Sequence, residues 1–275
     1  MKKYIKLAAA VSAALVTQYA SAGMVTMYGD GGSIQIPGNS NFQVASVYEN
    51  IVTSVGQELK GYGELTQING QPISNLCTNC ELTFVFDNYF VSSITGANAS
   101  FTGGNVSIYL GFGANNDFNP FASGSSAADI AAATNGALFL TLKGHEIAPG
   151  GVTLSSVVSS GNLLTPSFRF NGGGLWDVDM SGLGLANGNF NTNSFLAAFG
   201  GPTADMSFNT SGDTNFVPHA GECQPGPQGQ PSNGAACVAG SADIRGYVIP
   251  EPGTLALAGL GLMGLGFGGK RRKAA

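Results

Sequence analysis

Four cysteines are the residues of this sequence best suited to chemistry, since a thiol pair can form a disulfide, cycle in redox catalysis or bind zinc. Cys77 and Cys80 form a Cys-x-x-Cys motif, and Cys223 and Cys237 lie further apart. A redox motif opens a helix of a βαβ unit, whereas an alternating strand pattern follows Cys80, and a four-cysteine zinc site needs two close pairs. An oxidising compartment would favour two disulfides, most simply Cys77–Cys80 and Cys223–Cys237, although three connectivities are open.

The two histidines do not stand in a catalytic pattern. His145 and Glu146 lack the second histidine of a zinc-protease helix, because position 149 is proline, and His219 lies in a proline-rich stretch. We therefore expect both histidines at the surface. The sequence also lacks the Gly-x-Ser-x-Gly elbow of serine hydrolases. We predict no catalytic residue, no metal site and no cofactor, so the chain is not expected to be an enzyme.

Clusters of carboxylate and amide side chains leave calcium binding open as an alternative, because oxygen ligands hold calcium. No cluster fits the twelve-residue calcium loop, and asparagine is common in turns for conformational reasons. The clusters are Asn115, Asn116, Asp117 and Asn119; Asp177 and Asp179; and Asn187, Asn189, Asn191 and Asn193.

The first 22 residues have the composition of a secretory signal peptide. Three lysines precede an apolar stretch over residues 7–16, which is too short to span a membrane. Ala20 and Ala22 form a small-x-small cleavage site before Gly23. We predict that signal peptidase and the export machinery are partners of this chain and that the mature protein begins at Gly23.

The last 27 residues form a three-part tail. Pro250, Glu251 and Pro252 precede an uncharged apolar run over residues 253–269, which we predict to be a transmembrane helix of marginal length. A basic cluster that should stay cytoplasmic by the positive-inside tendency ends the tail: Lys270, Arg271, Arg272 and Lys273. The two prolines keep the preceding segment extended, as a protease cleft requires. This tail predicts a temporary anchor in the inner membrane.

The order of these three parts resembles the PEP-CTERM sorting signal, with the resemblance confined to residues 249–275. The resemblance implies recognition and cleavage near Pro250, Glu251 and Pro252 by an exosortase, an integral membrane protease of bacteria that make exopolysaccharide and biofilm. It also implies a final location at the cell surface or outside the cell, with exopolysaccharide as a further partner.

Charge excludes nucleic acid as a partner of the exported part. Residues 23–249 keep four of the 11 basic residues and 15 of the 16 acidic ones, a net charge of −11. Nucleic-acid binding needs a basic surface that neutralises phosphates.

The region 23–248 is predicted to be one β-rich exported domain, an antiparallel β-sandwich or jelly roll with at most one short helix. Apolar residues recur at period two in many short runs between glycine and asparagine turns. The helix is expected over residues 126–134 with Ser126 as its cap. The clearest runs are Leu82-Phe84-Phe86, Val106-Ile108-Leu110-Phe112, Leu138-Leu140-Leu142 and Trp176-Val178-Met180.

Three classes of function fit this sequence. A non-catalytic surface or matrix protein accounts for the tail and for the missing catalytic set. A carbohydrate-binding module would stack sugars on exposed aromatic residues such as Trp176 or Tyr109. A secreted hydrolase could use paired acids such as Asp177 and Asp179, which lie two apart on one strand face.

Overall fold

The computed structural model of the chain describes residues 24–161, 168–197, 199–214, 217–223 and 236–249. The predicted signal peptide with Ala20, Ala22 and Gly23, and the tail from Pro250 onward, lie outside these ranges. Within them, no helix is both long enough and apolar enough to cross a membrane. The transmembrane helix over residues 253–269 therefore stays a prediction.

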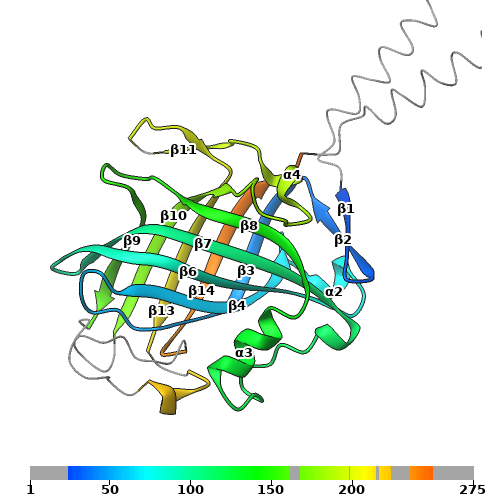
Figure 1. Cartoon of the computed structure of the whole chain (residues 1–275), viewed down its shortest axis with the longest axis horizontal. Coiled ribbons are helices and arrows are strands. Elements are labelled where there is room, and N and C mark those ends of the chain that lie inside the picture. The colour runs from blue at the N-terminus through cyan, green and yellow to red at the C-terminus, as the bar shows by residue number, and fades with distance from the viewer. Residues whose placement is uncertain (1–23, 162–167, 198, 215–216, 224–235, 250–275) are drawn as a thin grey trace, which may run out of the picture.

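The described chain is mainly antiparallel sheet with short helical turns (Figure 1). The strands are β1 (Met24–Gly29), β2 (Gly32–Pro37), β3 (Asn39–Glu49), β4 (Glu58–Ile68), β5 (Gln71–Pro72), β6 (Cys80–Thr95), β7 (Asn98–Phe112), β8 (Ala137–His145), β9 (Val152–Ser160), β10 (Arg169–Val178), β11 (Phe195–Leu196), β12 (Thr203–Ala204), β13 (Met206–Asp213) and β14 (Val238–Tyr247). The helices are α2 (Ile73–Leu76), α3 (Ser126–Ala133) and α4 (Asn187–Phe190), with 3-10 turns η1 (Gly113–Asn115) and η2 (Ala220–Glu222).

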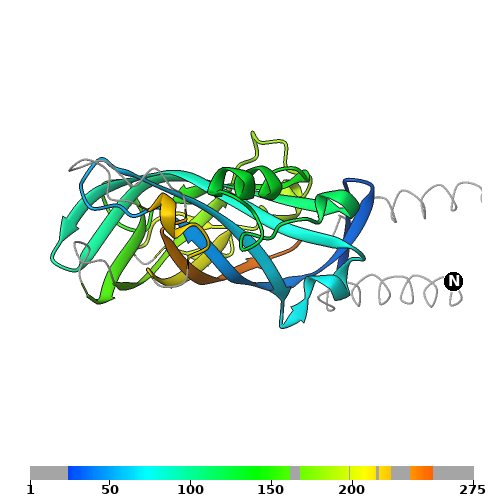
Figure 2. The same cartoon turned by 90° about the horizontal axis from the view of Figure 1, so that it is seen from below.

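The main sheet closes on itself. From β3 each strand pairs with the next through β4, β6, β7, β8, β10, β13 and β14, and β14 pairs back with β3. Figure 2 shows that the closed sheet is flattened, so that two layers face each other as in a sandwich. Closure leaves few exposed strand edges, which protects the sheet from pairing with other chains.

β8 and β9 together occupy one position in the closed sheet. β7 pairs with β8 through its second half and with β9 through its first half, and β10 pairs with the same two strands. Both β8 and β9 run antiparallel to β7, so they are two halves of one long strand interrupted by residues 146–151. The amide of Ile147 donates a hydrogen bond to the carbonyl of Val152 (2.7 Å), which closes the interruption into a tight loop.

The antiparallel all-β prediction is confirmed: three of the alternating runs lie in β6, β7 and β8, and the fourth begins in β10. The strands follow each other in sequence order around the sheet, so the connectivity is an up-and-down meander rather than the Greek-key order of a jelly roll. The run that begins at Trp176 ends earlier than predicted, because β10 stops at Val178 and Met180 is 56 % exposed.

The predicted helix forms α3, but two details of the prediction are wrong. Ser125 rather than Ser126 is the cap, and its side chain accepts a hydrogen bond from the amide of Ala128 (3.2 Å). The expectation of at most one short helix is also wrong, because α2 and α4 add single turns of four residues each. Turns this short carry no helical periodicity that a sequence could reveal.

The β1–β2 hairpin packs against one end of the closed sheet. Its loop is Asp30-Gly31, with φ of 47° and 79°, the left-handed geometry of a tight two-residue hairpin turn. The Asp30 carboxylate accepts hydrogen bonds from the amide of Phe112 (3.1 Å) and from the side chain of Asn115 (3.0 Å). These bonds attach the tip of the hairpin to the end of β7.

Candidate functional site

β14 is the last strand of the domain, and it directly precedes the three-part C-terminal tail in the sequence. β14 pairs with β13 on one side and with β3 on the other. Beyond it, the amide of Val248 donates to the carbonyl of Gly38 (2.8 Å), and the amide of Ile249 donates to the carbonyl of Asn189 (2.7 Å). The Asn189 side chain donates back to the carbonyl of Ile249 (3.3 Å). The chain is thus held by the folded domain up to the residue before Pro250.

The first described residue lies at the same end of the domain as the last. Met24 pairs with Pro37 in the β1–β2 hairpin, and the next residue, Gly38, accepts the hydrogen bond from Val248. Figure 1 shows β1 beside α4, the helix that contains Asn189. Met24 and Ile249, the first and last described residues, therefore lie at one end of the domain.

Comparison with known protein families identifies that segment. The model of the PEP-CTERM protein-sorting motif matches residues 248–273. This chain carries a PEP-CTERM sorting signal. The PEP-CTERM match includes the predicted motif residues Pro250, Glu251 and Pro252 and ends at Lys273. No curated protein and no solved structure matches the chain.

The PEP-CTERM signal implies that the chain is exported, sorted to the cell surface in association with the membrane and processed by an exosortase. The match begins at Val248, so its first two residues are those that bond to Gly38 and Asn189. The recognition segment and the folded domain therefore overlap, with no linker between them.

The four cysteines form the two disulfides that their spacing favours. Cys77, at the end of α2, is bonded to Cys80, which opens β6, and both are buried. Cys223 is bonded to Cys237, and their Cα atoms are 5.2 Å apart. Neither pair opens a helix of a βαβ unit. In the described ranges no group of three or more histidine, cysteine or acidic residues could hold a metal ion.

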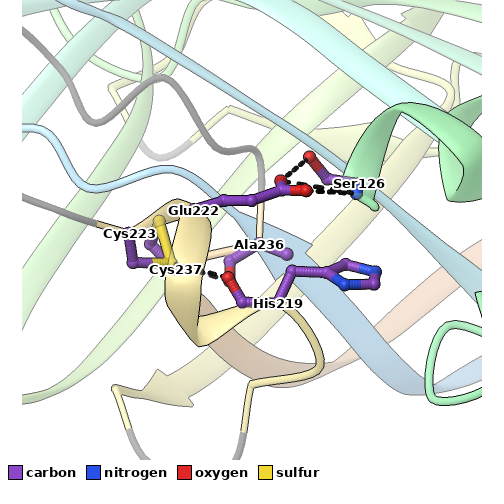
Figure 3. Close-up of a disulfide and its surroundings, with 6 residues drawn as sticks. All are labelled: Ser126, His219, Glu222, Cys223, Ala236 and Cys237. Carbon is purple, nitrogen blue, oxygen red and sulfur yellow. Dashed lines mark hydrogen bonds between the residues drawn. A yellow bond between two sulfur atoms is a disulfide. The ribbon is translucent and has the colours of Figure 1, made fainter. Parts of the chain in front are cut away.

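The Cys223–Cys237 disulfide holds η2 against α3 (Figure 3). Cys237 is fixed to the sheet because its amide donates to the carbonyl of Glu49 (2.8 Å). On the other side of the disulfide, the Glu222 carboxylate accepts hydrogen bonds from the hydroxyl and the amide of Ser126. A carboxylate at the first turn of α3 also interacts favourably with the helix dipole.

The side chain of His219 is largely removed from solvent, although the residue as a whole is half-buried, so the expectation that it lies at the surface is wrong. Its side chain is 8 % exposed, and its Nε2 lies 2.8 Å from Asp129 and 3.1 Å from the Ser123 hydroxyl. The hydroxyl of Tyr62 donates to the same Asp129 oxygen (2.5 Å). Burial, followed by this hydrogen bond, raises the pKa of Tyr62 well above its usual value.

The geometry of this cluster differs from that of a catalytic triad. In a triad the serine meets one ring nitrogen of histidine and the acid meets the other, so a proton can pass through the ring. Here Ser123 and Asp129 both meet Nε2 of His219. The cluster therefore joins α3, β4 and the η2 segment, and it does not activate the serine.

His145 is also buried, at 4 % exposure, and the surface expectation for it is wrong as well. Its Nδ1 lies 2.8 Å from Asp177, and its Nε2 lies 2.9 Å from the carbonyl of Pro202. Pairing places His145 opposite Leu175, so it reaches Asp177 across the β8–β10 ladder. This contact could not be predicted from the sequence, because residues 145 and 177 are far apart in the chain.

The two acids proposed for a hydrolase are each bound to a different partner. Asp177 faces His145, whereas Asp179 lies 3.0 Å from Lys143 and accepts a hydrogen bond from the Ser181 hydroxyl (2.6 Å). The bond from Ser181, followed by the nearby Lys143, holds the pKa of Asp179 below its usual value. The two carboxylates are therefore not arranged as an acid and a base on one substrate.

Trp176 is buried at 6 % exposure, so it is not the exposed sugar-stacking residue that the carbohydrate alternative offered. It stacks on Phe208 with ring centroids 4.0 Å apart, and its Nε1 donates to the hydroxyl of Tyr89 (2.6 Å). Tyr109, the other candidate, is half-buried on β7.

The oxygen-rich clusters were candidates for calcium binding. In the structure their side chains form hydrogen bonds with neighbouring parts of the fold. The side chain of Asn116 donates to Asn79 (3.1 Å), and Asp117 accepts from Asn135 (3.0 Å). Asn187 is buried, and its side chain donates to the hydroxyl of Thr141 (2.7 Å). These contacts give the amides a structural role in the loops between strands.

Proposed function

We propose that this protein is a non-catalytic component of the cell surface or of an exopolysaccharide matrix, released from an inner-membrane anchor by an exosortase. The observation that carries the proposal is the attachment of Val248 and Ile249 to Gly38 and Asn189, directly before the Pro-Glu-Pro segment. A cut at or after Pro250 leaves every described strand and both disulfides with the released domain. Processing would therefore separate the domain from its anchor without unfolding it.

The partners of the acidic and histidine side chains support the non-catalytic part of the proposal. His145 bonds Asp177 and the Pro202 carbonyl, and His219 bonds Asp129 and Ser123. A general acid or base must reach a substrate, and both rings are buried within the fold.

Fractionation of a host with and without its exosortase tests the proposal. Glu251→Ala should be exported and then remain in the inner membrane as a longer form, because the signal peptide and the basic cluster are intact. Asp243→Ala is the matched control, since Asp243 is an exposed acid on β14 close to the motif. The control should reach the same final location as the wild type. Release of Glu251→Ala at the wild-type level would contradict the proposal.

A surface groove favours carbohydrate binding as a second candidate function. The groove has a volume of about 510 Å³ and crosses β3, β10, β13 and β14 on their outer face. Serine side chains, Asn171 and the ion pair of Arg169 with Asp213 line it, and Phe121, 60 % exposed, stands at its side. Aromatic faces together with groups that donate and groups that accept hydrogen bonds suit the rings and hydroxyls of a sugar.

A glycan array with the mature domain tests this second candidate. Phe121→Ala and Asn171→Ala should each weaken any sugar binding that the wild type shows. Tyr28→Ala is the control, since Tyr28 is an exposed aromatic residue on the β1–β2 hairpin, away from the groove. If the wild-type domain binds no glycan, the carbohydrate-binding candidate is wrong and the matrix role stands without it.

A further inference from the structure

The interior of the closed sheet contains space that side chains do not fill. Two cavities of about 60 Å³ each lie inside it, and Glu49, Leu59, Leu154 and Thr210 line both. The first cavity is otherwise walled by aliphatic and aromatic side chains of the two facing layers. Since protein interiors pack with few voids larger than a water molecule, adjoining cavities of this size are unusual.

Glu49 brings a carboxyl group into this apolar space. The residue is 9 % exposed, and among the described residues no hydrogen bond or ion pair to its carboxyl oxygens is formed. Its backbone is fixed in the sheet by pairing with Gly61 and Val238 and by the bond from the Cys237 amide (2.8 Å). The side chain is therefore held inside the sheet.

The other polar groups that line the first cavity bond to each other or to the backbone. Trp176 Nε1 donates to the hydroxyl of Tyr89 (2.6 Å), and the Thr210 hydroxyl donates to the carbonyl of Ser241 (3.1 Å). Glu49 is thus the polar side chain of this wall that lacks a partner in the described part of the chain. A ligand that hydrogen-bonds this carboxyl would recover part of the free energy lost by leaving it unpaired.

We propose that the interior binds a small apolar molecule that carries one hydroxyl or carbonyl group, with the Glu49 carboxyl as its hydrogen-bonding partner. The interior of an eight-stranded closed sheet is filled by side chains or holds one small ligand. Burial raises the pKa of Glu49 to about 8, so at neutral pH its carboxyl is mainly protonated and can both donate and accept. A neutral polar group fits this partner, and the aromatic wall suits a ring.

The size of the two cavities limits the ligand to a compact one. Each cavity is smaller than the roughly 150 Å³ that admits benzene in an engineered protein core. A single ring can enter if Leu59 and Leu154, which both cavities share, move aside and join the two spaces. A long acyl chain would require far more displacement of the core.

Trp176 gives this proposal a direct readout, because it is the only tryptophan of the chain and lines the first cavity. Benzyl alcohol, p-cresol and toluene are titrated into the purified mature protein while tryptophan emission is followed. We expect a saturable change with the alcohol and the phenol, at an affinity at least about tenfold higher than for toluene. A wild-type protein without a saturable change would overturn the proposal.

Variants distinguish the effect of the Glu49 carboxyl on binding from the effect of the cavity space. Glu49→Leu should lose the preference for benzyl alcohol over toluene, whereas Glu49→Gln should keep part of it, because an amide also donates and accepts. Glu64→Gln on β4 is the control, since Glu64 lines neither cavity. Ala242→Leu places extra carbons in the first cavity and should reduce binding of all three probes even if Glu49→Leu fails to fold. An unchanged preference in Glu49→Leu, or unchanged binding in Ala242→Leu, would contradict the proposal.

Discussion

The amide of Val248 donates a hydrogen bond to the carbonyl of Gly38 (2.8 Å), and this bond joins the two ends of the exported domain. Gly38 follows Pro37, the partner of Met24 in the first hairpin. While the signal peptide and the tail are both uncut, the folded domain would be attached to the membrane through this one end. On the proposed function, the opposite end of the closed sheet would then be directed away from the membrane.

Lack of a linker before the Pro-Glu-Pro segment should slow its processing. The two hydrogen bonds between Ile249 and Asn189 must open before an extended chain can enter a protease cleft. Insertion of four Gly/Ser residues between Ile249 and Pro250 should speed cleavage by about fivefold or more, since each such bond is worth about 1 kcal/mol. Pulse-chase measurement of the longer form gives the rate. The same insertion between Pro149 and Gly150 is the control, and equal acceleration there would refute this explanation.

Removal of the Cys223–Cys237 disulfide should release η2 from α3 and leave the closed sheet folded. Closing a loop of this length contributes roughly 3 kcal/mol in the chain-entropy account. Cys223→Ser with Cys237→Ser should lower the unfolding temperature and speed proteolysis near Glu222. In the wild type, alkylation under denaturing, non-reducing conditions should label no thiol. Stoichiometric labelling would show that the disulfides are absent.

The buried Tyr62–Asp129 contact should stabilise the packing of α3 on β4. Tyr62→Phe removes the hydroxyl that donates to Asp129 and leaves that carboxylate, which is 1 % exposed, with one partner fewer. We expect a loss of about 1–3 kcal/mol in the free energy of unfolding. Tyr109→Phe is the matched control on β7, where the ring is half-buried. Equal loss in the two variants, measured by urea unfolding, would show that the Asp129 bond contributes nothing specific.

Glu49 should make the domain less stable as pH rises. Burial raises its pKa from an ordinary value of 4.5 to about 8, so between these values the folded state binds a proton that the unfolded state releases. Stability from this group is full below the unfolded value and is lost as pH rises toward 8, by up to about 1.4 kcal/mol per pH unit. Glu49→Gln should flatten this dependence in urea unfolding at about pH 5 and about pH 8. A slope identical to that of the wild type would contradict the burial of an uncharged carboxyl.

Much of the strand content could be predicted from sequence because one face of each strand packs in the core. Leu82, Leu110 and Leu142 are all nearly fully buried at period-two positions, as the pattern indicates. Closure of the sheet could not be predicted, since the pairing of β10 with β13 and of β14 with β3 depends on contacts between distant segments. The β1–β2 hairpin did have a local signal that was missed, the Asp30-Gly31 pair between two alternating runs.

The sorting motif could be predicted from sequence because its function depends on a contiguous segment. The burial and the partners of the interior polar groups depend on the fold instead. Trp176 belongs to the same alternating face as the buried Val178, and that pattern alone should have excluded it as an exposed platform. Glu49 and Asp129 sit among apolar or small residues without any local motif. Their burial follows from the register of β3 and from the packing of α3.

The mass of the mature protein, isolated from its final location in a host with its exosortase and in one without it, tests the central claim most directly. With the exosortase, we expect a chain that begins at Gly23, lacks Lys270, Arg271, Arg272 and Lys273, and ends near Pro250, Glu251 and Pro252. Without the exosortase, we expect a longer chain that keeps the basic cluster and stays in the inner membrane. Wild-type protein with an intact C-terminus at the cell surface would show that the tail is an ordinary anchor and would contradict the account.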